Sequence, residues 1–262
     1  MARQEGWRAV QNIGGFGNVS FVPPLSSRGG ETAADTPPTV LAFDTGPGNA
    51  LLDGAVEALT NGAQTYDKDG EIAATAPPDA TLLQQMLLHP YFGRSPPKTT
   101  GREEFTKELG AEWISAGKEA GLDDATIIAT FTELTAVSIA DAYVAHLPCG
   151  VIPMDGTSGL AEVVIGGGGG SNPTMMKRLQ HHLDRRWPAG ATPKVVGHEV
   201  IGWDSDAKEA VTFAILGWLC VNGFHGNIPS CTGASEATIL GKIAPGRNYK
   251  ELLRKVLTAD EL

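Results

Sequence analysis

Asp44 lies in the stretch FDTGPGN, where a short apolar run gives way to a segment with apolar residues at helical spacing. The run over residues 39–43 predicts a strand, and residues 50–60 predict a helix. We therefore expect Asp44 to end a strand, at the edge where open α/β sheets bind their ligands. A carboxylate in that position can act as a general base. The alternative is a turn-forming Asp that bonds its own backbone, and the stretch alone leaves both interpretations open.

Five consecutive glycines, Gly166 to Gly170, follow the strand predicted over residues 161–165. Ser171 and Asn172 then supply a helix cap, and Pro173 suits the first helical position. Backbone amides at such a turn favour an anion or the polar edge of a nucleotide. The alternative is a flexible linker, but the strand and the capped helix on either side favour a nucleotide-facing turn. The spacing matches neither the dinucleotide-binding fingerprint nor the phosphate loop of P-loop enzymes.

Glu209 is a second acidic candidate with a structural alternative. Asp206-x-x-Glu209 spells a capping box, in which the Glu side chain reaches back to the helix N-terminus, and the residues by themselves favour that interpretation. His181 and His182 are adjacent on a predicted helix, where neighbouring side chains point in different directions, so we expect both at the surface. No metal site is predicted.

The elements that must position these residues alternate between strands and helices. Residues 10–22 predict a hairpin with Gly14 and Gly15 at its tip, and residues 194–196 predict a further strand. Helices are predicted near residues 82–88, from Asp123 to about His146 with one apolar stripe, and over residues 207–219. The loop over residues 92–105 contains consecutive prolines, and long loops of this kind are often functional. The pattern favours an α/β fold with a mainly parallel sheet and an antiparallel initial hairpin.

Composition narrows the class of protein. The chain has 262 residues, of which 42% are hydrophobic, and a formal net charge of −10, which argues against nucleic acid and anionic membrane as partners. No run approaches eighteen apolar residues and the first residues do not resemble a secretion signal, so a cytoplasmic protein is predicted. Three scattered cysteines, Cys149, Cys220 and Cys231, predict reduced thiols.

Six stretches, in order, resemble the anhydro-N-acetylmuramic acid kinases of the sugar kinase–actin–Hsp70 superfamily. The resemblance implies a ribonuclease H-like or actin-like ATPase lobe, with a mixed sheet, an N-terminal β-hairpin and flanking helices. Residues 1–245 would form the second lobe of the family with its C-terminal segment, and residues 246–262 a C-terminal helix or tail. The stretches are NIGGFGNVSF (12–21), FDTGPGNALLDG (43–54), FGRSPPKTTGREEF (92–105), VIGGGGGSNPTMM (164–176), DAKEAVTFAILG (206–217) and GNIPSCTGASEATILG (226–241).

The resemblance also implies an activity: ATP-dependent opening of a 1,6-anhydro sugar by water, with phosphorylation of its 6-oxygen. Asp44 matches the catalytic base of the family, and Glu209 matches an acidic position implicated in proton handling. Mg²⁺ would accompany ATP. The substrate would be 1,6-anhydro-N-acetylmuramic acid or, in a close relative, levoglucosan. The residues that match ATP-binding positions are Gly14, Gly15, Gly167, Gly168 and Asn172.

Members of the family have two lobes, and the Gly-Thr-Ser-x-Asp-Gly loop of the first lobe does not occur in this sequence. One hypothesis is therefore an active anhydro-sugar kinase, as a possible homodimer or paired with a separate first lobe. A second is a non-catalytic lobe that binds a nucleotide or a partner. A third is an incomplete gene model, which the DNA upstream of Met1 would test.

Overall fold

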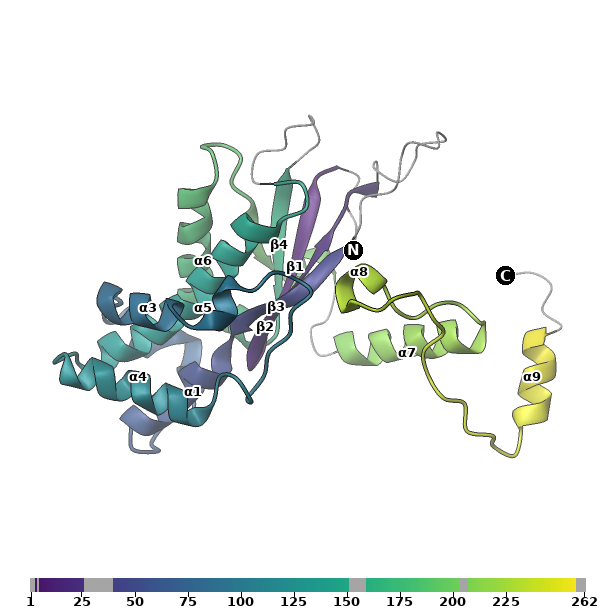
Figure 1. Ribbon diagram of the computed structural model, residues 1–262, viewed down its shortest axis with the longest axis horizontal. Coiled ribbons are helices and arrows are strands. Elements are labelled where there is room, and N and C mark those ends of the chain that lie inside the picture. The colour runs from purple at the N-terminus through teal and green to yellow at the C-terminus, as the bar shows by residue number, and fades with distance from the viewer. Residues whose placement is uncertain (1–2, 4, 26–39, 151–158, 203–206, 258–262) are drawn as a thin grey trace.

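The computed structural model describes residues 3, 5–25, 40–150, 159–202 and 207–257 and contains a five-stranded mixed sheet in the order β3-β2-β1-β4-β5 (Figure 1). The pairs β1–β2 and β2–β3 are antiparallel, whereas β4 pairs in parallel with both β1 and β5. The predicted hairpin is confirmed, but a mainly parallel sheet is not, because β3 returns antiparallel beside β2. The strands are β1 (Trp7–Ile13), β2 (Phe16–Val22), β3 (Leu41–Pro47), β4 (Leu160–Gly166) and β5 (Lys194–Gly197).

The helices begin where the sequence offers caps. Asp123 accepts a hydrogen bond from the Thr126 amide at the start of α5, and Asn172 accepts one from the Met175 amide at the start of α6. The helix α4 was not predicted. The described helices are α1 (Asn49–Leu59), α2 (Glu71–Ala74), α3 (Ala80–Leu87), α4 (Lys107–Glu119), α5 (Asp124–His146), α6 (Pro173–Arg186), α7 (Lys208–Val221), α8 (Pro229–Thr232) and α9 (Tyr249–Leu257), with 3-10 helices η2 (Lys68–Gly70), η3 (Pro90–Gly93), η4 (Gly168–Ser171) and η5 (His198–Ile201).

Helix α5 is the centre of the core, and the prediction of a single apolar stripe is wrong. It packs against α1, α2, α3, α6 and β3, so it is buried on every side from Ile127 to Ala140. Its hydroxyl groups are satisfied by carbonyl oxygens: Thr135 Oγ1 donates to the carbonyls of Pro47 and Gly48 at 3.2 and 3.0 Å, which ties α5 to the end of β3. Helix α5 is long and apolar enough to span a membrane. However, 89% of its most apolar stretch is buried inside the protein, as in a core helix.

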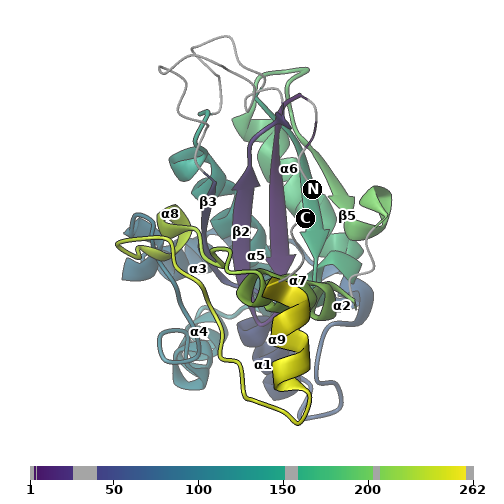
Figure 2. The same ribbon diagram turned by 90° about the vertical axis from the view of Figure 1, so that its right-hand side faces the viewer.

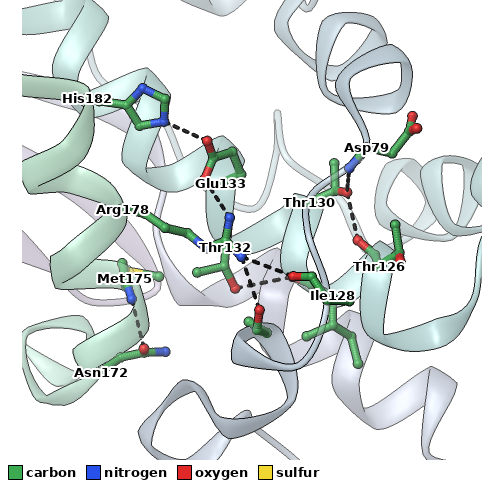
Figure 3. Close-up of polar contacts among 12 residues, drawn as sticks. Asp79, Thr126, Ile128, Thr130, Thr132, Glu133, Asn172, Met175, Arg178 and His182 are labelled. Carbon is green, nitrogen blue, oxygen red and sulfur yellow. Dashed lines mark hydrogen bonds and ion pairs between the residues drawn. The ribbon is translucent and has the colours of Figure 1, made fainter. Parts of the chain in front are cut away.

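A buried charge cluster joins α5 to α6 (Figure 3). Glu133 accepts hydrogen bonds from Arg178 Nη1 at 2.9 Å and from His182 Nε2 at 2.7 Å. Arg178 also donates to the carbonyl of Ala73 at 3.0 Å, which links α2 to the same cluster. The prediction of a surface position is therefore right for His181, which is exposed, and wrong for His182, which faces α5.

The helices α1, α5 and α6 lie on one side of the sheet, whereas α7 and α9 stand apart from it on the other side (Figures 1 and 2). Helix α7 keeps large apolar side chains exposed, with Phe213 at 72%, Ile215 at 50% and Trp218 at 49% of their full exposure. Helix α8 touches the body through Ser230, whose hydroxyl donates to the Val40 carbonyl at 2.7 Å. The core therefore lies between the sheet and the α1–α6 layer.

Candidate functional site

Asp44 lies within β3 and does not end it, which corrects the prediction from the sequence. The ladder between β2 and β3 continues past a bulge near Asp44 until Phe16 pairs with Pro47. Pairing with β2 thus overrides the turn signal of Gly46 and Pro47, because a proline is tolerated at the end of an edge strand. Asp44 consequently sits on the edge strand of the sheet, facing the loop over residues 94–104.

That loop holds the Asp44 carboxylate in place. Oδ2 accepts hydrogen bonds from Thr99 Oγ1 at 2.7 Å and from the Thr100 amide at 2.9 Å. The backbone is fixed as well, since the Asp44 amide donates to the Lys98 carbonyl at 3.1 Å and the Tyr91 hydroxyl donates to the Asp44 carbonyl at 2.6 Å. Within the described part of the chain, Oδ1 has no hydrogen bond. The carboxylate is therefore oriented by one oxygen and open at the other, and it does not bond its own backbone as a turn-forming Asp would.

The tip of the first hairpin accepts hydrogen bonds from the first backbone amides of α1. The carbonyl of Gly14 accepts a hydrogen bond from the Asn49 amide at 2.7 Å, and the carbonyl of Gly15 accepts from the amides of Gly48 and Ala50 at 3.0 Å each. A Cβ at Gly48 would overlap the Gly14 carbonyl oxygen, so only glycine fits there. Neither amide of Gly14 or Gly15 donates a hydrogen bond within the described residues. These two amides are available to an anion.

The glycine turn after β4 packs directly against the end of β1. Gly167 has φ +81°, and a Cβ there would lie 2.7 Å from the Ile13 carbonyl oxygen. Because β1 and β4 are parallel and adjacent, with Asn12 beside Gly166, their carboxyl ends bring the hairpin tip and the turn to one edge of the sheet. This close packing rules out the flexible-linker interpretation and confirms a turn between a strand and a capped helix.

A cavity of about 200 Å³ opens beside this turn, between α1, η2 and the start of α6. Of the five predicted ATP-binding residues, Gly168 and Asn172 line it, whereas Gly14, Gly15 and Gly167 do not. The cavity was not predicted, because its wall comes from three segments far apart in the sequence. Its lining residues are Asn49, Leu52, Asp53, Tyr66, Asp67, Lys68, Asp69, Gly168, Ser171 and Asn172.

The charge of the cavity comes from its carboxylates. Burial raises the pKa of Asp53 from 3.8 to about 6, and this side chain forms no hydrogen bond with any described residue. Asp67 is buried, and both of its carboxylate oxygens already accept hydrogen bonds, from the amides of Ile72 and Ala73 at 2.8 and 3.0 Å. Lys68 is the cation among the lining side chains. The cavity therefore suits hydrogen-bond donors, such as hydroxyl and amino groups, better than phosphate.

We expect Asp53→Asn to stabilise the protein at pH 7. The raised pKa means that the favourable contribution of Asp53 is complete below pH 3.8 and is lost as the pH rises through about 6. Removing the charge should increase the free energy of unfolding at pH 7 by about 1 kcal/mol, after allowance for partial solvent exposure. Urea unfolding at pH 7 and pH 4 checks this, since most of the difference should be lost at pH 4. Glu57→Gln, exposed on the same helix, is the control, and equal effects of both variants would contradict the interpretation.

Among the described residues, Glu209 contacts neither Asp44 nor the side chains that line the cavity. It lies exposed in the first turn of α7 and has no hydrogen bond or ion pair with a described residue. The helix begins after Ala207 without a side-chain cap, and Asp206, the other half of the predicted capping box, lies outside the described residues. The assignment of Glu209 as a second acid therefore stays a prediction.

Sequence reasoning missed the residues that complete the site. Thr99 and Thr100 hold Asp44, and Asp53 lines the cavity, but none of the three was singled out. The one available signal was the length and irregularity of the loop over residues 92–105. For a metal, the described residues contain no group of three or more His, Cys, Asp or Glu side chains that could hold an ion.

Solved structures with partial likeness include the activator of the 2-hydroxyisocaproyl-CoA dehydratase from Clostridium difficile with bound ADPNP. It is 11% identical, with a TM-score of 0.38, and the match covers 72% of this chain and 53% of that one. Component A of the Acidaminococcus fermentans (R)-2-hydroxyglutaryl-CoA dehydratase is 15% identical, with a TM-score of 0.37, over 72% of this chain and 54% of that one. TM-scores this low do not establish a common fold.

Sequence relatives are much more similar. The anhydro-N-acetylmuramic acid kinase of Microcystis aeruginosa is 39% identical over 236 residues, which cover 90% of this chain and 57% of the relative. The enzyme of the same name from Streptomyces coelicolor is 40% identical over 247 residues, covering 94% of this chain and 55% of the relative. The chain thus spans little more than half the length of these relatives.

The family model described as anhydro-N-acetylmuramic acid kinase matches residues 1–246, which include both the Asp44 region and the glycine turn. On this match, supported by the relatives, the chain belongs to the anhydro-N-acetylmuramic acid kinase family.

Proposed function

We propose that this chain acts in an ATP-dependent kinase that opens and 6-phosphorylates 1,6-anhydro-N-acetylmuramic acid. The observation that carries the proposal is the Asp44 carboxylate, oriented through Oδ2 by Thr99 and Thr100 and open at Oδ1. Family membership supports kinase chemistry, and the names of the relatives supply the substrate. Because the chain spans little more than half the length of these relatives, the activity of a whole enzyme is proposed here.

The proposed chemistry uses Asp44 as a general base. Oδ1 accepts a proton from water as the water oxygen attacks the anomeric carbon, and the bond from that carbon to the bridging 6-oxygen breaks. The released 6-oxygen attacks the γ-phosphorus of ATP, and ADP leaves. The product is N-acetylmuramic acid 6-phosphate. Glu209 remains a candidate for proton handling, in a conformation that brings it to the sugar.

For the nucleotide, the described residues fit two different parts. Asp53 and the other polar side chains of the cavity suit the hydroxyl and amino groups of a nucleoside. The amides of Gly14 and Gly15, together with the turn at Gly167, suit the phosphates. Mg²⁺ would accompany the phosphates, and we assign no side chain to it.

Release of ADP tests the proposal. The purified chain is incubated with ATP, Mg²⁺ and either 1,6-anhydro-N-acetylmuramic acid or levoglucosan, and ADP is measured with a coupled assay. We expect sugar-dependent ADP release, and the preferred sugar decides between the two substrates. Folded protein that releases no ADP with either sugar would contradict turnover by this chain.

The exposed face of α7 favours a second candidate, a lobe that binds nucleotide and a partner chain without turnover. Val211, Ile215 and Trp218 are exposed at helical spacing i, i+4 and i+7, so they share one face of α7, and apolar surface of this kind marks interaction sites. The partner would be a second copy of this chain or a separate first lobe of the family. Sedimentation velocity checks self-association, and a monomer at all concentrations that does not bind a hydrophobic dye would count against this candidate.

A further inference from the structure

Lys98 is docked beside Asp44 on the edge of the sheet. Its carbonyl accepts the hydrogen bond from the Asp44 amide, so its backbone continues the edge of β3. Its ammonium group lies 4.8 Å from the centre of the Tyr91 ring and 5.7 Å from that of Phe43. Phe43 and Asp44 are consecutive, and the Tyr91 hydroxyl donates to the Asp44 backbone carbonyl, so the two rings that hold this cation also lie beside Asp44.

The charge of Lys98 is not matched by a carboxylate. Arg94, which also lies over the Tyr91 ring, pairs with Glu104 through two hydrogen bonds at 2.9 and 2.5 Å. Lys98 forms no ion pair with any described residue. The hydrogen bonds to Asp44 Oδ2 come from Thr99 and Thr100 and not from Lys98. The Asp44 carboxylate is near Lys98 but forms no ion pair with it, so the half-buried ammonium group still lacks a paired carboxylate and suits an anionic ligand.

The surroundings of Lys98 support the same conclusion. Burial lowers the pKa of Lys98, the neighbouring Arg94 lowers it further, and Asp44 opposes both. His146 packs edge-on against Phe43, and its pKa is lowered by burial and then by Lys98. An incoming carboxylate would therefore offset the repulsion of Lys98 by Arg94 as well as pair with Lys98.

We infer that Lys98 binds a carboxylate carried by the anhydro sugar and so selects acidic anhydro sugars over neutral ones. The inference rests on the proposed function, in which the sugar lies against Asp44. N-acetylmuramic acid carries a carboxylate on its lactyl group, whereas levoglucosan and 1,6-anhydro-N-acetylglucosamine carry none. A contact with the two rings alone would fix the position of Lys98 but would give no preference between these sugars.

The test is sugar binding by the whole chain, measured by calorimetry, so that it does not depend on turnover. Two ligands that differ only in the lactyl group are compared: 1,6-anhydro-N-acetylmuramic acid and 1,6-anhydro-N-acetylglucosamine. We expect Lys98→Met to weaken binding of the acidic sugar about 10- to 100-fold, the cost of one charge-assisted hydrogen bond, and to leave the neutral sugar unchanged. Lys98→Arg should retain most of the preference, and Lys118→Met, at an exposed lysine of α4, should change neither.

The outcomes separate this inference from the function on which it rests. If Lys98→Met weakens both sugars equally, or neither, Lys98 does not select the acidic sugar, although the proposed function stands as long as the wild type binds anhydro sugars. If the folded wild-type chain binds neither sugar, the proposed substrate is wrong for this chain, and the inference is overturned with it.

Discussion

Asp44→Asn should abolish sugar-dependent ADP release, with a loss of about 10³-fold or more in kcat, the range expected for removing a general base. The amide is nearly the same size, and its oxygen can still accept the hydrogen bonds from Thr99 and Thr100. It cannot accept a proton from water at neutral pH. The fold should therefore survive while the chemistry is lost, and the measurement is the coupled ADP assay with both sugars.

Three further variants make this result specific. Thr99→Val removes one of the two hydrogen bonds that orient Asp44, so it should lower kcat less than Asp44→Asn, and Thr99→Ser should restore most of it. Asp124→Asn, at an exposed position that pairs with Lys118, should have no effect on turnover. Full activity in Asp44→Asn would remove the base from the proposed mechanism.

Glu133→Ala should destabilise the protein by about 3 kcal/mol, the lower end of the cost of breaking a buried ion pair. Glu133 is only 9% exposed and balances Arg178 and His182 from α6. Its loss would leave the Arg178 guanidinium, whose Nε already has no hydrogen-bond partner, buried without a counter-charge. In a chain of this size we expect a fall in Tm of about 6 to 12 °C, measured by calorimetry.

The pH dependence of this effect has a definite sign. Burial alone would raise the pKa of Glu133, but the hydrogen bonds and charges of His182 and Arg178 outweigh it and hold the pKa below its ordinary value of 4.5. The contribution of Glu133 is therefore present above pH 4.5 and is lost as the pH falls through the lowered pKa. The difference between wild type and Glu133→Ala should shrink in acid. Glu119→Ala, at an exposed position on α4, should change stability by less than about 0.5 kcal/mol, and an equal loss in both variants would refute the ion-pair explanation.

The sequence by itself determined the elements whose signals are local. Asp123 and Asn172 bond amides three residues ahead, so the starts of α5 and α6 could be predicted from their neighbours. The hairpin around Gly14 and the turn at Gly167 follow from glycines placed between strands or between a strand and a helix. The motifs also carried the family resemblance, which the match over residues 1–246 bears out.

Tertiary structure alone decided how these elements form a site. Whether Asp44 ends a strand depends on β2, because pairing of Phe16 with Pro47 extends β3 through a sequence that by itself favours a turn. The orientation of its carboxylate depends on Thr99 and Thr100, 55 and 56 residues away along the chain. Local signals cannot reveal such contacts, since they arise only when distant segments pack together.

Asp53 and His182 illustrate the same difference between what local sequence determines and what packing decides. Asp53 and His182 both lie on helices that periodicity predicts, yet one becomes an unpaired carboxylate in a cavity and the other the partner of a buried Glu133. A side chain's neighbours across an interface set its solvation and its pKa, and those neighbours come from other elements. The sequence therefore determined which elements form and where they are capped, while packing decided which of their polar groups face one another, face a cavity or face solvent.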